Sequence, residues 1–178
     1  FRETAPAALR PEMFLDADGR RVPERSLEHG LAVAVPGSPR GLFDLHAKLG
    51  RISFASVAAP AIALAREGFV VDRWLAEDLA EERAKLFDRP GSRALYFVDG
   101  EPLSEGALLR QPELARTLEL YARGGAEAFY EGEVAERLVV EVQNAGGVLT
   151  LGDLASYRAS WRKPLIGWFR GLEILTAP

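Results

Sequence analysis

The chain has 178 residues, of which 48% are hydrophobic and 27% charged, and its net charge at pH 7 is −4. That length suits one well-filled hydrophobic core, so we expect residues 1–178 to form a single unit. The acidic balance argues against nucleic acid as a partner, and no apolar run approaches the roughly 18 residues of a membrane span. The absence of cysteine excludes disulfides, thiolate metal ligands and a cysteine nucleophile.

The first half of the chain predicts one strand and three helices. Residues 31–37 (LAVAVPG) alternate valines and stop at a Pro-Gly turn, which indicates a brief strand. Residues 38–49, 56–67 and 71–87 carry apolar side chains at helical spacing. The predicted inward face of the first of these helices consists of Leu42, Leu45, His46 and Leu49.

The second half predicts further helices and a hairpin. Residues 111–125 and 126–147 have helical periodicity, and the stretch before them, with its turn signals, crosses between helical layers. Thr150 and Asp153 have the spacing of a capping box, with Asp where Glu or Gln is usual. Residues 161–178 are rich in aromatic and β-branched side chains around turn glycines and predict a β-hairpin or two strands. The predicted class is α+β, mostly helical with a few edge strands.

No catalytic, metal-binding or phosphate-binding pattern is evident from the residues alone. His29 and His46 have no metal-ligand spacing, and His46 is interpreted as a packed or capping side chain. No phosphate-cradling pattern occurs, and Gly124-Gly125 and Gly146-Gly147 are interpreted as helix caps. We therefore expect no metal, no cofactor and no catalytic residue within the chain.

Five segments change this interpretation because they occur in one order and register. They are RETAP (2–6), VPGSPRG (35–41), PAIALAREGFVV (60–71), AFYEGEVAERL (128–138) and GGVLTLGDLASY (146–157). Together they resemble the gamma-glutamyltranspeptidase family, and the resemblance covers nearly the whole chain. It implies that residues 1–178 are a middle portion of the large subunit, within the αββα sandwich of the N-terminal nucleophile hydrolases.

The resemblance also implies a mechanism and partners. The family's precursor cuts itself into a large and a small subunit, and a threonine exposed by that cut attacks the γ-glutamyl amide. Thr4, Thr117, Thr150 and Thr176 do not stand in the family's Thr-Thr context, so we expect the nucleophile outside this chain and the chain alone to be inactive. The expected partners are the remainder of the large subunit, the small subunit and a small γ-glutamyl substrate, with self-association of the isolated chain and a periplasmic or secreted location.

One functional residue carries over from the family motif. Its arginine binds the α-carboxylate of the γ-glutamyl group, and Arg2 occupies that place here. A guanidinium suits the task because it offers two parallel donors and stays charged. The alternative is a terminal arginine frayed in solvent.

Two other functions stay open at this point. Cephalosporin and glutaryl acylases share the family's body, and the chain could come from such an enzyme. A non-catalytic scaffold domain that kept the fold is the other alternative.

Overall fold

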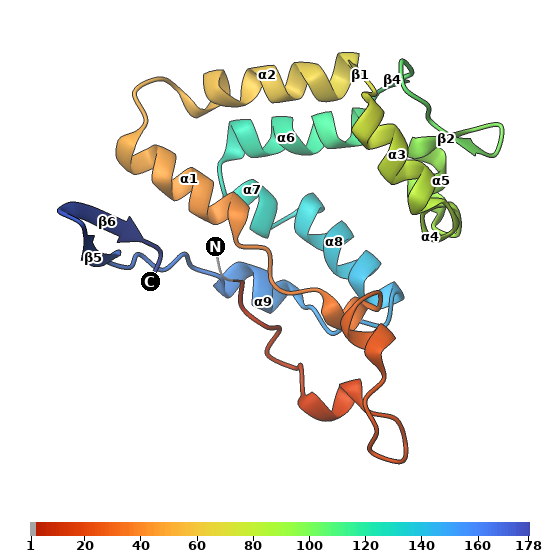
Figure 1. Cartoon of the computed structure of the whole chain (residues 1–178), viewed down its shortest axis with the longest axis horizontal. Helices are drawn as coiled ribbons and strands as arrows, with labels where there is room; N and C mark the ends of the chain where they lie inside the picture. Colours follow the sequence, from red (N-terminus) through yellow and green to blue (C-terminus); the bar gives the residue numbers. More distant parts are fainter. Residues whose placement is uncertain (1–2) are drawn as a thin grey trace.

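The computed structural model describes residues 3–178, which form a mainly helical chain with three small antiparallel sheets (Figure 1). The helices are α1 (Ser38–Leu49), α2 (Phe54–Glu67), α3 (Arg73–Glu81), α4 (Arg83–Phe87), α5 (Pro90–Tyr96), α6 (Pro112–Gly124), α7 (Glu127–Tyr130), α8 (Glu133–Asn144) and α9 (Leu151–Ser156). The strands pair as β1 (Phe69–Val70) with β4 (Leu108–Leu109), β2 (Phe97–Val98) with β3 (Glu101–Pro102), and β5 (Leu165–Phe169) with β6 (Leu172–Thr176). The predicted α+β class is confirmed.

Helices α2 and α6 lie side by side and run in opposite directions (Figure 1). At one end, the rings of Phe54 and Tyr121 meet edge to face with their centroids 4.9 Å apart. At the other end, Gln111 N donates to Ala65 O at 2.7 Å. Ser53 begins α2 by accepting a hydrogen bond from the backbone N–H of Ser56, so the helix starts two residues earlier than predicted.

The main core forms where α8 and α9 meet α7 and the extended chain before α1. On α8, Ala135, Val139 and Val142 recur at helical spacing and are buried. Leu149 and Leu154 on either side of the α9 start are fully buried against them. The remaining buried members of this cluster are Val35, Ala126 and Tyr130.

The strand predicted at residues 31–37 is wrong. Gly30–Ala32 instead form a turn of 3₁₀ helix, which His29 caps by accepting from Leu31 N at 3.2 Å. The chain then runs extended, and within residues 3–178 only Val35 pairs, in one bridge with Thr4. An apolar alternation therefore marks an extended chain here without a neighbouring strand to make it a sheet.

Two helix predictions also need correction. The helix predicted over residues 71–87 is divided at Glu82, and Arg83 after the break donates to Gly100 O at 2.8 Å, which ties α4 to the β2–β3 turn. In α1, the leucines of the face predicted to be buried are exposed, whereas His46 of the same face packs against Phe54. Phe43 supplies a further contact of α1, against Phe54 and Tyr121. The exposed leucines of that face are Leu42, Leu45 and Leu49.

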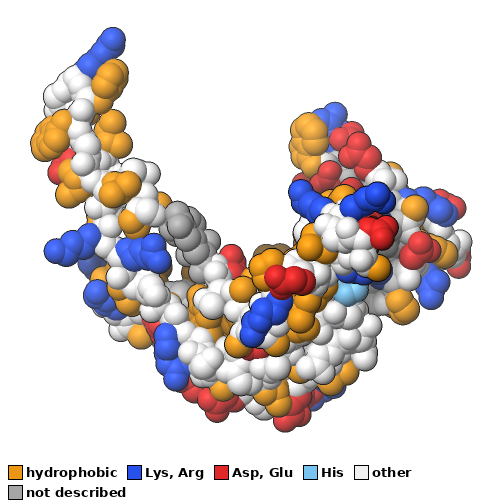
Figure 2. All heavy atoms as spheres, turned by 90° about the horizontal axis from the view of Figure 1, so that it is seen from below, with side chains coloured by type: hydrophobic (Ala, Val, Ile, Leu, Met, Phe, Trp, Pro, Cys, Tyr) orange, Lys and Arg blue, Asp and Glu red, His pale blue; other side chains and the backbone are white. Residues whose placement is uncertain are grey.

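The predicted hairpin is confirmed as β5 and β6. Arg170 and Gly171 both have positive φ, at 49° and 79°, which is the conformation of a tight two-residue hairpin turn. Every residue of the two strands is exposed, and apolar side chains occupy both faces. The hairpin projects from the helical body, and Figure 2 shows apolar side chains along it. Sheets with two apolar faces are normally covered on both sides.

A close backbone contact joins the N-terminal part of the chain to the end of α8. Gly30 N donates to Ala145 O at 2.9 Å, and a Cβ on Gly30 would overlap backbone atoms of Val142, Ala145 and Gly147. Gly146 has a φ of 81° and follows the helix as the predicted cap does. Gly147 N donates to Val142 O at 2.8 Å, so Gly147 also belongs to the cap, as predicted. It has a second role that was not predicted, because the absence of a Cβ lets the backbone of Gly30 approach.

Candidate substrate-binding cleft

An open cleft of about 700 Å³ lies beside the first turns of α1. Its walls are Glu3 and Thr4, the start of α1, residues 157–162 after α9, and Ala177–Pro178 after the hairpin. Acidic and basic side chains both line it, namely Glu3, Asp44, Arg158 and Arg162. The molecule is hollowed beside the projecting hairpin in Figure 2. Polar groups of both signs are what a zwitterionic ligand requires of its site.

Glu3 and Thr4 of the RETAP segment line one edge of this cleft, and hydrogen bonds hold the chain at Thr4 and at Ala7, directly after the segment. Val35 N donates to Thr4 O at 2.9 Å, and Ala7 N donates to Asp153 Oδ1 at 2.8 Å. Arg2 itself lies outside the described residues. Its neighbours Glu3 and Thr4 line the cleft, so the segment that carries the predicted substrate-binding arginine reaches this place.

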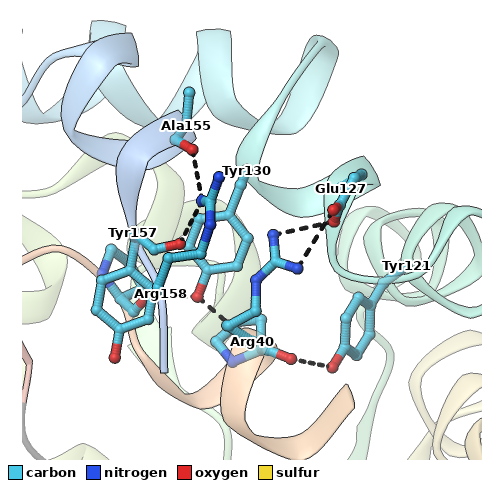
Figure 3. Close-up of polar contacts among 9 residues, drawn as sticks. Arg40, Tyr121, Glu127, Tyr130, Ala155, Tyr157 and Arg158 are labelled. Carbon is cyan, nitrogen blue, oxygen red and sulfur yellow. Dashed lines mark hydrogen bonds and ion pairs between the residues drawn. The ribbon is translucent and has the colours of Figure 1, made fainter. Parts of the chain in front are cut away.

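The turn that begins α1 is held by two tyrosines of the α6 and α7 block (Figure 3). Tyr121 donates its hydroxyl hydrogen to Pro39 O, and Tyr130 donates to Pro36 O, each at 2.5 Å. The Tyr130 oxygen also accepts from Arg40 N at 3.2 Å. Burial is the main cause that raises the pKa of Tyr121 to about 12, and burial also raises the pKa of Tyr130. Both phenols therefore stay protonated donors at neutral pH.

Arg40, in the first turn of α1, adds an ion pair to the contacts of the two tyrosines (Figure 3). Its guanidinium makes a two-point contact with Glu127, with Nη2 to Oε2 at 2.9 Å and Nη1 to Oε1 at 3.3 Å, and its side chain is only 12% exposed. The same guanidinium lies 5.2 Å from the centre of the Tyr130 ring, which stacks on Tyr157. Tyr157 lines the cleft, so this group of side chains connects the cleft wall to the core.

Tyr130→Phe is expected to lower the free energy of unfolding by about 1–3 kcal/mol, because Arg40 N loses its acceptor and Pro36 O loses its donor. Tyr121→Phe removes one hydrogen bond, to Pro39 O, and we expect a loss of about 0.5–1.5 kcal/mol. Urea unfolding of the two variants in the full-length protein measures both values. Equal stability of Tyr130→Phe and the wild type would show that the hydroxyl does not hold the turn.

The other residues that the sequence analysis singled out have structural contacts. His46 lies with Nε2 2.8 Å from Ile52 O and its ring against Phe54. Thr117 donates its hydroxyl to Glu113 O within α6. Among residues 3–178 no cluster of three or more potential ligands could hold a metal ion. No helix in the same range is long and apolar enough to cross a membrane.

Sequence reasoning missed the tyrosines and Arg40. Their bonds join positions about 80 to 95 residues apart, such as Pro36 and Tyr130, and no local pattern reports such pairs. A signal was nevertheless present, because Arg40 lies in the VPGSPRG segment and Tyr130 in the AFYEGEVAERL segment. The structure brings these two separate motifs into direct contact.

Solved structures place the fold in a class of enzymes that includes gamma-glutamyltranspeptidases and acylases. The chain matches the crystal structure of gamma-glutamyltranspeptidase from Helicobacter pylori with a TM-score of 0.96 and 37% identity, over 100% of this chain and 51% of that one. It matches cephalosporin acylase from Bacillus halodurans with a TM-score of 0.83 and 27% identity, over 99% of this chain and 34% of that one.

A family model described as gamma-glutamyltranspeptidase matches residues 1–178. The chain belongs to the gamma-glutamyltranspeptidase family, as the five sequence segments predicted. It is 38% identical over 179 residues to the glutathione hydrolase proenzyme of Escherichia coli K12, a match that covers 100% of this chain and 31% of that protein. The chain thus spans about a third of the length of that relative.

Proposed function

We propose that the parent protein is a γ-glutamyl hydrolase or transferase that acts on glutathione or related γ-glutamyl compounds. One observation carries this proposal: the similarity to a glutathione hydrolase proenzyme extends over the whole chain. We also propose that residues 1–178 are one part of the large subunit of an αββα enzyme. The nucleophile is then a threonine of the small subunit, exposed when the precursor cuts itself.

The proposed reaction proceeds through an acyl-enzyme. The threonine hydroxyl attacks the γ-carbonyl carbon while the free α-amine of the same residue takes the hydroxyl proton. The bond between that carbon and the amide nitrogen breaks, and the leaving amine takes up a proton. Water or an amino acid then attacks the ester and releases glutamate or a new γ-glutamyl compound, which regenerates the threonine.

In this proposal the present chain supplies recognition of the glutamyl group. Arg2 binds the α-carboxylate with two parallel N–H donors. The support is the place of its neighbours Glu3 and Thr4 on the cleft wall and the family motif in which Arg2 stands.

The remainder of the large subunit and the small subunit are the proposed partners. The two faces of the β5–β6 hairpin carry exposed leucine, isoleucine and tryptophan side chains. Two exposed leucines of α1, Leu42 and Leu45, line the cleft beside it. Apolar area of this kind is normally covered in a stable protein. We propose that further strands and helices of the parent cover it, and that the isolated segment self-associates through it.

The full-length protein is expected to cut itself and to release p-nitroaniline from γ-glutamyl-p-nitroanilide. Glutaryl-p-nitroanilide is the matched comparison, because it keeps the carboxylate and lacks the α-amine. Turnover of the first substrate with little of the second supports a γ-glutamyl enzyme. Preference for the glutaryl compound supports the second candidate, an acylase, which the likeness to the Bacillus halodurans enzyme favours. Absence of both self-cleavage and turnover identifies a scaffold.

A further inference from the structure

We propose that Asp153 is a positioning residue for the γ-glutamyl site, because its carboxylate fixes the chain that carries Arg2. The inference rests on the function proposed above. Asp153 lies in the first turn of α9 and reaches back to Ala7, 146 residues earlier in the chain, with its Oδ1 accepting from Ala7 N at 2.8 Å. Ala7 directly follows the RETAP segment (2–6) and is five residues after Arg2.

The two oxygens of Asp153 have different partners. Oδ2 completes the capping box of α9, accepting from Thr150 N at 2.9 Å and from the Thr150 hydroxyl at 2.6 Å. Oδ1 is not needed for the cap and is directed at Ala7. A capping box usually has Glu or Gln at this position. The shorter Asp is explained by this second contact, because one carboxylate has to reach the helix start and a separate segment together.

The element that carries Asp153 is firmly held. Leu154, the next residue, is fully buried, and Tyr157 just after α9 stacks on Tyr130 of the core. The carboxylate is ionised at neutral pH. Partial burial alone would raise the pKa of Asp153, but the hydrogen bonds from Thr150 and Ala7 outweigh it and lower the pKa below its ordinary value. A charged acceptor makes the bond to Ala7 N stronger than a neutral one would.

The anchored segment has a second fixed point close to Arg2. Thr4 O accepts from Val35 N at 2.9 Å, and between the two fixed points Pro6 is buried and has a restricted φ. Leu9 N donates to Pro6 O at 3.0 Å, which closes a turn in which Ala7 is the second residue. The chain from Thr4 to Leu9 is therefore held at Thr4, at Ala7 and by its own turn, and in the sequence Arg2 stands two residues before Thr4.

Two substitutions in the full-length enzyme break the same hydrogen bond from opposite sides. Asp153→Glu keeps the charge and the usual capping residue but moves the carboxylate by one methylene. Ala7→Pro removes only the donor, at a turn position where proline is favoured. Each is expected to raise the KM for γ-glutamyl-p-nitroanilide by roughly tenfold with kcat within about twofold, because the arginine is misplaced and the chemistry is not. The loss of one hydrogen bond lowers Tm only slightly.

Thr150→Ala is the matched control. It removes the hydroxyl of the cap but leaves Oδ1 of Asp153 on Ala7 N. We expect it to lower Tm and leave KM unchanged. The double variant Asp153→Glu with Ala7→Pro is expected to raise KM no more than either single change, since both remove one bond.

A raised KM in Asp153→Glu and Ala7→Pro, with no rise in Thr150→Ala, supports the positioning role. Unchanged KM in those variants, with an active wild type, overturns it and leaves the proposed function standing. An equal rise of KM in Thr150→Ala overturns it too, because KM would then follow the stability of α9. A wild type that does not turn over the γ-glutamyl substrate overturns the proposed function and the role of Asp153 with it.

Discussion

Arg2→Lys in the full-length enzyme is expected to raise the KM for γ-glutamyl-p-nitroanilide by roughly thirtyfold, equivalent to about 2 kcal/mol. Lysine keeps the positive charge but replaces two parallel donors in a planar fork with a single compact ammonium. Arg2→Ala removes the charge as well and should raise KM further. Steady-state kinetics on the purified, processed enzyme measure both changes.

A substrate without the carboxylate shows whether the loss comes from the proposed contact. In 4-aminobutyryl-p-nitroanilide the α-carboxylate is missing, so the wild type and Arg2→Lys should handle it alike. Arg20→Lys is the matched control variant, because the Arg20 side chain is exposed and its ion pair with Asp18 is a 3.7 Å surface contact, while the backbone bonds of Arg20 to Asp16 are kept by lysine. Identical KM values for the wild type and Arg2→Lys on the γ-glutamyl substrate would remove Arg2 from the site.

Gly30→Ala is expected to lower the free energy of unfolding by about 3 kcal/mol or prevent folding, since its Cβ would overlap backbone atoms of three residues at the end of α8. Backbone atoms cannot rotate away as a flexible side chain can. The hydrogen bond from Gly30 N to Ala145 O would be pushed apart by the same overlap. Thermal unfolding, and the yield of soluble processed protein, measure the loss.

Gly91→Ala in α5 is the matched control for this experiment. A Cβ at Gly91 would meet nothing within 4 Å, and its φ is not in the positive region. Alanine is expected to leave stability unchanged or raise it by about 0.5–1 kcal/mol, because it restricts the unfolded chain. A Gly30→Ala protein that unfolds at the wild-type temperature would mean that the two backbones can separate without cost.

Several elements could be predicted from the sequence because local signals decide them. Helix α1 spans Ser38–Leu49 as its periodicity predicted, and Thr150 with Asp153 forms the predicted capping box. The hairpin was predictable because Gly171 supplies a tight turn between two β-rich runs. These features depend on neighbours a few residues away.

The predictions that were wrong share one physical cause: whether a residue is buried or paired depends on which distant parts of the chain pack against it. The valines of residues 31–37 alternate as a strand does, yet in the part of the chain that the structure describes only Val35 pairs with another residue. Leu45 and Leu49 have helical spacing, yet their side chains are exposed, whereas Phe43 packs against the core. The contact of Asp153 with Ala7 could not be predicted either, because a capping box has no signal for a second partner.

The bond between Ala7 and Asp153 also has a consequence for the order in which the protein folds during synthesis. The two residues are 146 positions apart, so the donor leaves the ribosome long before its acceptor has been made. At roughly 5–20 residues per second, the interval is about 7 to 30 s. All residues of α1, α2 and α6 are synthesised before Asp153. The edge of the cleft formed by Glu3 and Thr4 is therefore completed late in translation, although it is among the first parts of this sequence to be made.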